Sequence, residues 1–152
     1  MYVCMGNICR SPLLEGWARK ALADAGRSDR VRVDSAGTGD WHVGRPPDTR
    51  AIAVARRHGL DISAQRARLV GPDDFRRYDL MLCADHDNLR WLRRQAPGDA
   101  TAVIARVLDW CEVGEGGDVP DPYQGDAADF EHVNRLARDA AQGLLRKLPP
   151  QA

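Results

Sequence analysis

Short runs of apolar residues, well separated along the chain, have the character of buried β-strands. The runs are residues 2–4, 31–35, 79–84 and 101–104, the last leading into 108–110. The second run ends in Ala36-Gly37-Thr38-Gly39, a glycine-containing stretch that marks a turn. The third run is almost continuously apolar, which is typical of a strand buried on both faces of a parallel sheet.

Between these runs the apolar positions follow the period of a helix. Leu14, Trp17, Ala18, Ala21, Leu22 and Ala25 recur at helical spacing behind Ser11-Pro12 and before Gly26, which predicts a capped amphipathic helix. Further helices are predicted from a cap at Asp48 to Gly59, over 87–95, and along a stripe from Phe130 to Leu144 that Pro149 ends. This alternation predicts an α/β fold, a doubly wound and mainly four-stranded parallel sheet with helices on both faces. Ligands then bind beyond the carboxyl ends of the strands, and the first such end is Cys4.

The length and charge of the chain limit the number of domains and the classes of partner that it can have. A chain of 152 residues fits a single domain over 1–152. Basic and acidic residues balance at 22 each, so no global field points to a nucleic-acid or anionic-membrane partner. We find neither a run of about 18 apolar residues nor a secretion signal, which predicts a cytoplasmic protein without a membrane partner. Only three residues precede Cys4, so either the first strand is short or the true start codon lies upstream of Met1.

The cysteines and histidines give no metal pattern. Cys4, Cys9, Cys83 and Cys111 lack the paired close spacings of a zinc site, and the four histidines form no ligand-spaced pair. Asp85-His86-Asp87 has the character of a solvated helix start. We therefore expect reduced thiols, no metal and no cofactor.

The segment from Cys4 to Ser11 places five residues between a thiol and a guanidinium, on a loop from a strand end to a helix start. Unpaired N–H groups at a helix N-terminus, with Gly6 in the loop, can wrap around a tetrahedral oxyanion such as phosphate. Arg10 adds a planar fork for two phosphate oxygens, and the same cradle favours the thiolate of Cys4. The alternative is a buried structural cysteine with Arg10 as a surface charge.

The sequence CMGNICRSP resembles the loop of the low-molecular-weight protein tyrosine phosphatases. Four further segments resemble that family in the right order, and together they cover nearly the whole chain: 34–38, 41–47, 82–90 and 118–123. The resemblance implies Cys4 as nucleophile, Arg10 as the clamp on phosphate and transition state, and Asp121 as acid and then base. Pro120 and Pro122 restrict the backbone of Asp121, although an ordinary Asp-Pro turn explains the same residues.

The resemblance also implies roles for residues around the loop. The residues implied in phosphate binding and loop support are Met5, Gly6, Asn7, Ile8, Cys9, Ser11 and Ser35. Those implied in a pocket wall suited to a phenyl phosphate are Met5, Ile8, Trp41 and Tyr123. Ser11 as a helix cap and Asn7 as a left-handed turn residue are simpler interpretations that are compatible with these roles. Two positions depart from the family: Gln65, where many relatives have histidine, and Gln124, where some have a second tyrosine.

These observations predict hydrolysis of phosphotyrosine through a phosphocysteine intermediate. Two alternatives are a thiol-coupled arsenate reductase, whose relay cysteines the chain lacks, and a non-catalytic phosphopeptide-binding module, which has no use for a cysteine beside an acid. The implied partner is a tyrosine-phosphorylated protein, with a bacterial tyrosine kinase as one candidate, and we expect a monomer or weak dimer. Cys9 has no role in the displacement and is a candidate redox partner of Cys4.

Overall fold

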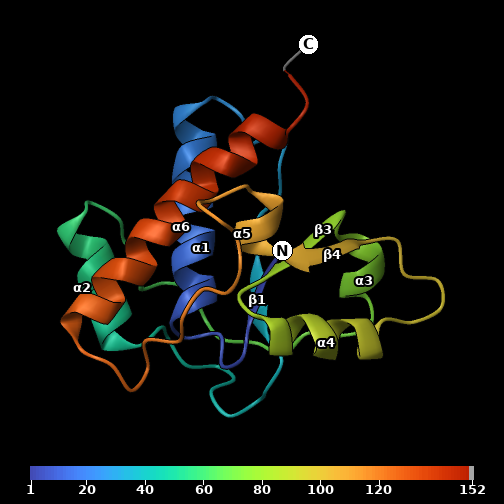
Figure 1. Cartoon of the computed structure of the whole chain (residues 1–152), viewed down its shortest axis with the longest axis horizontal. Helices are drawn as coiled ribbons and strands as arrows, with labels where there is room; N and C mark the ends of the chain where they lie inside the picture. The colour runs from blue at the N-terminus through green and yellow to red at the C-terminus, as the bar shows by residue number, and fades with distance from the viewer. Residues whose placement is uncertain (151–152) are drawn as a thin grey trace.

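The protein, described over residues 1–150 of a computed structural model, is built on a four-stranded sheet in the order β2-β1-β3-β4 (Figure 1). The strands are β1 Tyr2–Cys4, β2 Ser35–Gly37, β3 Leu80–Cys83 and β4 Val103–Arg106. All three pairings are parallel, with Cys4 opposite Gly37 and Cys83 opposite Arg106. The carboxyl ends of the strands therefore share one edge of the sheet, and the predicted doubly wound α/β fold is confirmed.

Two predicted strand positions are wrong. The second strand is Ser35–Gly37 rather than 31–35, because β1 begins at Tyr2 and Tyr2 already pairs with Ser35, so residues 31–33 lie beyond the reach of its ladder. Residues 108–110 belong to a short helix, α5 Val107–Trp110. β4 ends opposite the last residue of β3, and the chain beyond it has no ladder partner and closes a helical turn instead.

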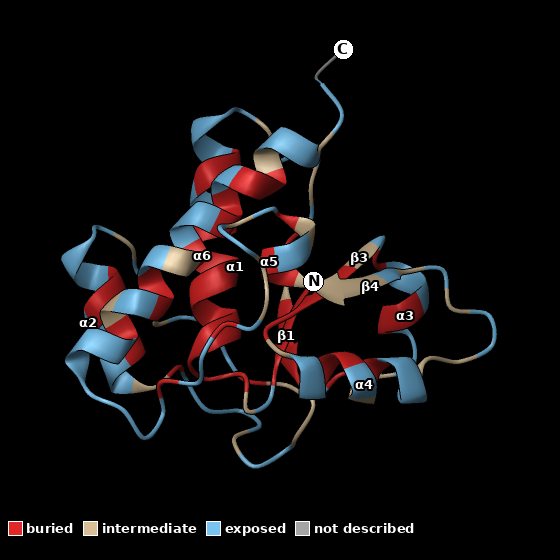
Figure 2. Ribbon diagram, viewed as in Figure 1, coloured by how far each residue is buried: buried red, intermediate tan, exposed pale blue. Residues whose placement is uncertain are grey.

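The remaining helices are α1 Arg10–Asp24, α2 Thr49–Arg57, α3 Asp74–Arg77, α4 His86–Gln95 and α6 Ala127–Lys147. They cover both faces of the sheet, and their buried residues turn towards the interior (Figure 2). Within residues 1–150 no helix is long and apolar enough to cross a membrane.

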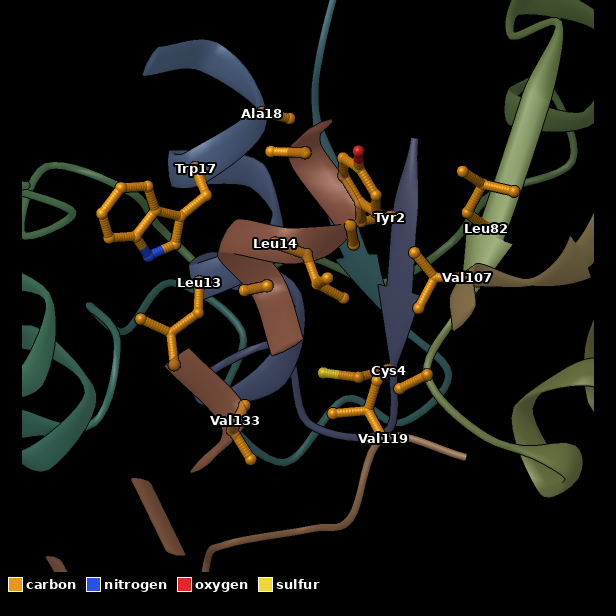
Figure 3. Packing of buried hydrophobic residues seen from close by; sticks show 14 of the residues in the cluster. Tyr2, Cys4, Leu13, Leu14, Trp17, Ala18, Leu82, Val107, Val119 and Val133 are labelled. Atoms are coloured by element: carbon orange, nitrogen blue, oxygen red, sulfur yellow. The ribbon is translucent and has the colours of Figure 1, made fainter. Parts of the chain in front are cut away.

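The side chains of β1 divide between two cores because successive residues of a strand point to opposite faces. Tyr2 and Cys4 pack in one cluster with residues of α1, α2, α5 and α6, part of which Figure 3 shows with Leu13, Leu14 and Trp17 labelled. Val3 packs in the other cluster with residues of α3 and α4. Cys4 thus stands at the end of a central strand, on the face that α1 covers.

The start of α1 differs from its prediction. Its N-cap is Cys9, no side chain caps its first turn, and Ser11 lies inside the helix. The predicted cap at Ser11 is therefore wrong, because the Ser11 hydroxyl contacts Cys4 and Asn7 instead. The predicted cap at Asp48 is confirmed, since its carboxylate accepts from the Arg50 amide.

Candidate active site

The loop after β1 wraps around the sulfur of Cys4. The Asn7 amide donates to Cys4 Sγ at 3.3 Å, and Ser11 Oγ lies 3.1 Å from the same sulfur. Asn7 supplies the sharp turn with a left-handed backbone, φ 58°. A Cβ at Gly6 would lie 3.0 Å from the ring of His42, so glycine lets the loop pass beneath that ring. The loop thus forms a closed turn with the thiol at its base.

A buried hydrogen-bond network holds the loop in this shape. Asn7 Nδ2 donates to Ser11 Oγ at 2.7 Å and to Ser35 Oγ at 3.0 Å, and Ser35 Oγ donates to Glu15 Oε1 at 2.8 Å. Asn7 Oδ1 accepts from the Arg68 amide at 3.0 Å. A satisfied buried network of this kind fixes a single geometry.

Sequence reasoning missed Glu15, which is only 6% exposed. The available signal was its position one helical turn after Ser11, on a face of α1 that must be buried. Gln65, where many relatives have histidine, contacts the backbone of α1. Its Nε2 donates to the Pro12 carbonyl at 3.0 Å, so it ties the first turn of α1 to the loop that carries Ala67.

Arg10 is buried beside the thiol, with 3% exposure. Its NH1 donates to Asp85 Oδ2 at 2.7 Å and to the Val119 carbonyl at 3.0 Å, while its NH2 lies 3.9 Å from Asp121 Oδ2. Burial opposes the charge of Arg10, but Cys4 and Asp85 outweigh it and hold the pKa above its ordinary value. Arg10 is therefore a fixed cation beside Cys4.

Asp85 was predicted as part of a solvated helix start and of the segment 82–90 that resembles the family, with no role in the site, and the structure gives it two roles. It caps α4 in a reciprocal capping box with Asn88, and it is the ion-pair partner of Arg10. The signal that could have found it is its place at the carboxyl end of β3, the edge of the sheet where Cys4 lies.

A hollow of about 230 Å³ opens above the loop. It is lined by Cys4, Met5, Gly6, Ile8, Cys9, Arg10, Trp41, His42, Asp121 and Tyr123. The four residues predicted for the pocket wall lie together here, and three of them are strongly exposed, Trp41 by 68%. His42 was not predicted as a site residue. A larger hollow of about 310 Å³ lies at the opposite end of β1, around Met1, and contains none of the predicted site residues.

Asp121 enters the hollow from the segment between α5 and α6. Its Oδ1 accepts from the Tyr123 amide at 3.1 Å, and its side chain is 42% exposed. The Tyr123 ring is held from behind by the Arg50 guanidinium, 5.5 Å away, which also stacks on Phe130 at 4.6 Å. The carboxyl group therefore lies at the wall of the hollow, near the cation that faces the thiol.

This arrangement is suited to displacement at a tetrahedral oxyanion. It combines a nucleophilic sulfur, N–H donors at the start of a helix, a guanidinium and a carboxyl group that can supply a proton to a leaving oxygen. Burial raises the pKa of Cys83 and of Cys111 to about 12. Within residues 1–150, no three His, Cys, Asp or Glu side chains group as they would to hold a metal ion.

Known proteins resemble this chain along its whole length. A family model described as "Low molecular weight phosphotyrosine protein phosphatase" matches residues 1–152. The low molecular weight protein-tyrosine-phosphatase of Streptomyces coelicolor is 41% identical, covering 99% of this chain and 93% of its own. The crystal structure of YfkJ from Bacillus subtilis superposes with a TM-score of 0.87 at 37% identity, covering 95% of this chain and 90% of that one. A Drosophila arginine phosphatase superposes with a TM-score of 0.88 at 26% identity, covering 95% and 94%.

Proposed function

The chain belongs to the low molecular weight phosphotyrosine protein phosphatase family, and we propose that it hydrolyses phosphotyrosine through a phosphocysteine intermediate. The main support for this proposal is that Cys4, Arg10 and Asp121 all line one hollow. We further propose that residues 1–152 act as one phosphatase domain, which the match of the family model over the whole chain supports.

In the first step, Cys4 Sγ attacks phosphorus and the bond from phosphorus to the phenolic oxygen breaks. Asp121 donates its proton to that oxygen, so tyrosine leaves neutral and the phosphoryl group stays on sulfur. Arg10 uses NH1 to hold Asp85 and Val119, which leaves Nε and NH2 as a fork for two phosphoryl oxygens. This fork and the loop N–H groups stabilise the charge that the transition state spreads over those oxygens.

In the second step, the carboxylate of Asp121 takes a proton from water while the water oxygen attacks phosphorus. The sulfur–phosphorus bond breaks, and inorganic phosphate and the Cys4 thiolate are released. Ser11 Oγ, 3.1 Å from the sulfur, can donate a hydrogen bond to the departing thiolate. Cys4 and Asp121 thereby return to their starting protonation states.

The wall of the hollow favours an aryl phosphate. Met5, Ile8, Trp41 and Tyr123 offer apolar and aromatic surface against which a phenyl ring can pack, while a serine phosphate would leave this surface in water.

We propose a tyrosine-phosphorylated protein as partner, with a bacterial tyrosine kinase as one candidate, and a chain that acts as a monomer or weak dimer. Because one structural relative is named an arginine phosphatase, phosphoarginine is the competing substrate to assay.

The other cysteines weigh against a thiol-coupled arsenate reductase. A redox relay needs further thiols that can reach Cys4, whereas Cys83 and Cys111 are buried and do not line the hollow that Cys4 lines. A phosphopeptide-binding module that performs no chemistry would not require a carboxyl group opposite the thiol.

The test is turnover of ³²P-labelled phosphotyrosine peptide by the parent and by Cys4→Ser. We expect Cys4→Ser to lose turnover but still bind vanadate, because the N–H cradle and Arg10 remain. Rapid acid quench should trap label on the parent and on Cys9→Ser, the matched control in the same loop, but not on Cys4→Ser. Substantial turnover by Cys4→Ser, or faster hydrolysis of phosphoarginine than of phosphotyrosine, would contradict the proposal.

A further inference from the structure

The segment that leads to Asp121 cannot position it unaided. Between α5 and the acid, the chain adopts left-handed conformations at Glu112, Gly114, Gly116 and Gly117, with φ between 53° and 92°. Glycine has more conformational freedom than any other residue, so a stretch of this composition does not by itself fix the path of the chain beyond it. The position of Asp121 must therefore be set by contacts made after this stretch.

Those contacts begin at residues 117–119. The Gly117 amide donates to Asp109 Oδ1 at 2.9 Å, and Asp118 Oδ1 accepts from the His86 amide at 3.0 Å. The Val119 amide donates to the Ala84 carbonyl at 2.8 Å. The chain is thus fastened to α5, to the start of α4 and to the end of β3 just before it reaches the acid.

One side chain joins two of these attachments. Arg106 closes β4, and its Nε donates to Asp109 Oδ2 while its NH1 donates to Asp118 Oδ1, both at 2.9 Å. The two aspartates raise the pKa of Arg106, which keeps it charged. Arg106 therefore links β4 to the two carboxylates that accept hydrogen bonds from the amides of Gly117 and His86.

From this anchor to the acid the chain has little freedom. Val119 is held by Ala84 and by Arg10, and Pro120 and Pro122 fix their own φ angles on either side of Asp121. A shift at residue 118 is thus passed on to Asp121 rather than absorbed. We propose that Arg106 is a positioning residue for Asp121, an inference that rests on the proposed role of Asp121 as the general acid.

The proposed effect is on geometry rather than on stability. An exposed ion pair contributes little to folding, and Arg106 does not line the hollow. A misplaced catalytic group, in contrast, can lower a rate by up to about 100-fold for a displacement of about 1 Å. Arg106 lies outside the segments that resemble the family, and Asp118 begins the segment 118–123 but does not line the hollow, so their effect should appear only in steps in which Asp121 transfers a proton.

The experiment compares Arg106→Met and Arg106→Lys with Arg76→Met. Arg76 is a matched control, because it also bridges two aspartates, Asp73 and Asp99, away from the hollow. We expect Arg106→Met to lower kcat/KM, which reports the first step alone, by about tenfold on phenyl phosphate and by less than about twofold on 2,4-dinitrophenyl phosphate, since only the first leaving group needs the proton. Arg106→Lys should recover part of the loss, and Arg76→Met should leave the ratio of the two rates unchanged.

Two further measurements separate positioning from a general structural defect. In an Asp121→Asn background, Arg106→Met should change kcat by less than about twofold, because the group it positions is already absent. Amide hydrogen exchange should become faster at Gly117 and His86 in Arg106→Met but not in Arg76→Met. This exchange is measured without turnover, so it tests the anchor even if the proposed function fails. An unchanged leaving-group ratio, additive effects with Asp121→Asn or unchanged exchange would each overturn the inference.

Discussion

At the residue scale, Arg10 connects the thiol, the acid segment and the start of α4 through one guanidinium. We expect Arg10→Lys to lower kcat on aryl phosphates at least about 100-fold, because one ammonium cannot replace a fork that binds two oxygens in the transition state. Steady-state kinetics with vanadate inhibition as a parallel measure of binding would check this. A nearly normal kcat would mean that Arg10 has no direct part in the reaction.

The role of Asp121 as general acid can be tested by varying the leaving group of the substrate. For Asp121→Asn we expect a large fall in kcat/KM on phenyl phosphate and a smaller fall on 2,4-dinitrophenyl phosphate, because an amide cannot donate the proton that a strongly basic phenolate requires. The measurement is the slope of log kcat/KM, which reports the first step, against the pKa of the leaving group, and this slope should become steeper. An equal loss on every substrate would instead indicate that Asp121 supports the local structure through its bond to the Tyr123 amide.

Which residues the sequence could predict depends on how local their chemistry is. Cys4 and Arg10 lie at the two ends of one loop, so their spacing suggested an anion site once that loop was placed between a strand end and a helix start. Asp85 and Glu15 reach the site only through tertiary contacts, from the end of β3 and from the buried face of α1. Their positions in the sequence indicate a buried helix face and a strand end, but not the residues with which they pair.

At the element scale, the closed turn from β1 to α1 carries two thiols, Cys4 and Cys9, and this leads to a prediction about their oxidation. Peroxide should convert the Cys4 thiolate to a sulfenic acid, and the Cys9 thiol can then condense with it to form a disulfide and release water. Burial is the largest cause that raises the pKa of Cys9, with Asp48 and Cys4 adding to it, so Cys9 should act as the second thiol rather than the first to be oxidised.

We therefore expect brief peroxide treatment to inactivate the enzyme and dithiothreitol to restore it. In Cys9→Ser the same treatment should cause a largely permanent loss, because the sulfenic acid proceeds to irreversible states. Activity recovery and mass spectrometry of the Cys4–Cys9 peptide are the measurements, with Cys111→Ser as the control outside the loop. Full recovery of Cys9→Ser would contradict the prediction.

Helices were predicted more accurately than strands, for a physical reason. A helix makes its hydrogen bonds within one segment, so the stripe of α6 and the cap of α2 are visible locally. A strand is bounded by its neighbour, and the true extent of β2 follows from where β1 begins. Likewise, α5 begins where the ladder between β3 and β4 ends, and no local sequence pattern indicates where that ladder ends.

At the scale of the whole molecule, the topology brings distant residues to one edge of the sheet. Cys4, Asp85 and the segment of Asp121 are far apart in sequence, but β1 and β3 are neighbours and their carboxyl ends coincide. The alternation of strands and helices was enough to predict that edge as the site. It was not enough to predict the anchors that hold the acid segment there, since these depend on which side chains emerge from β4 and α5.

A polar network also joins three distant segments on the other side of the loop. Arg68 pairs with Asp34 and Asp74 at 3.0 Å each, and the Tyr78 hydroxyl donates to Asp34 at 2.9 Å. Burial alone would raise the pKa of Asp34, but the hydrogen bonds from Arg68, the Ser35 amide and Tyr78 outweigh it and lower that pKa. A carboxyl group whose pKa is lower in the folded state stabilises the fold above its unfolded pKa of about 4, and this contribution is lost as the pH falls through the folded value.

We therefore expect Arg68→Met to lower the free energy of unfolding at pH 7 by about 1–2 kcal/mol, a modest loss because the network is partly exposed. The difference between the variant and the parent should shrink as the pH is lowered from about 4 towards 2, because protonation of Asp34 then removes the same interaction from the parent. Urea unfolding at a series of pH values measures both quantities. Arg76→Met, whose two ion pairs are exposed, should unfold nearly like the parent at pH 7. A difference between Arg68→Met and the parent that stayed constant down to pH values near 2 would show that Arg68 stabilises the fold by packing of its side chain and not through the charge of Asp34.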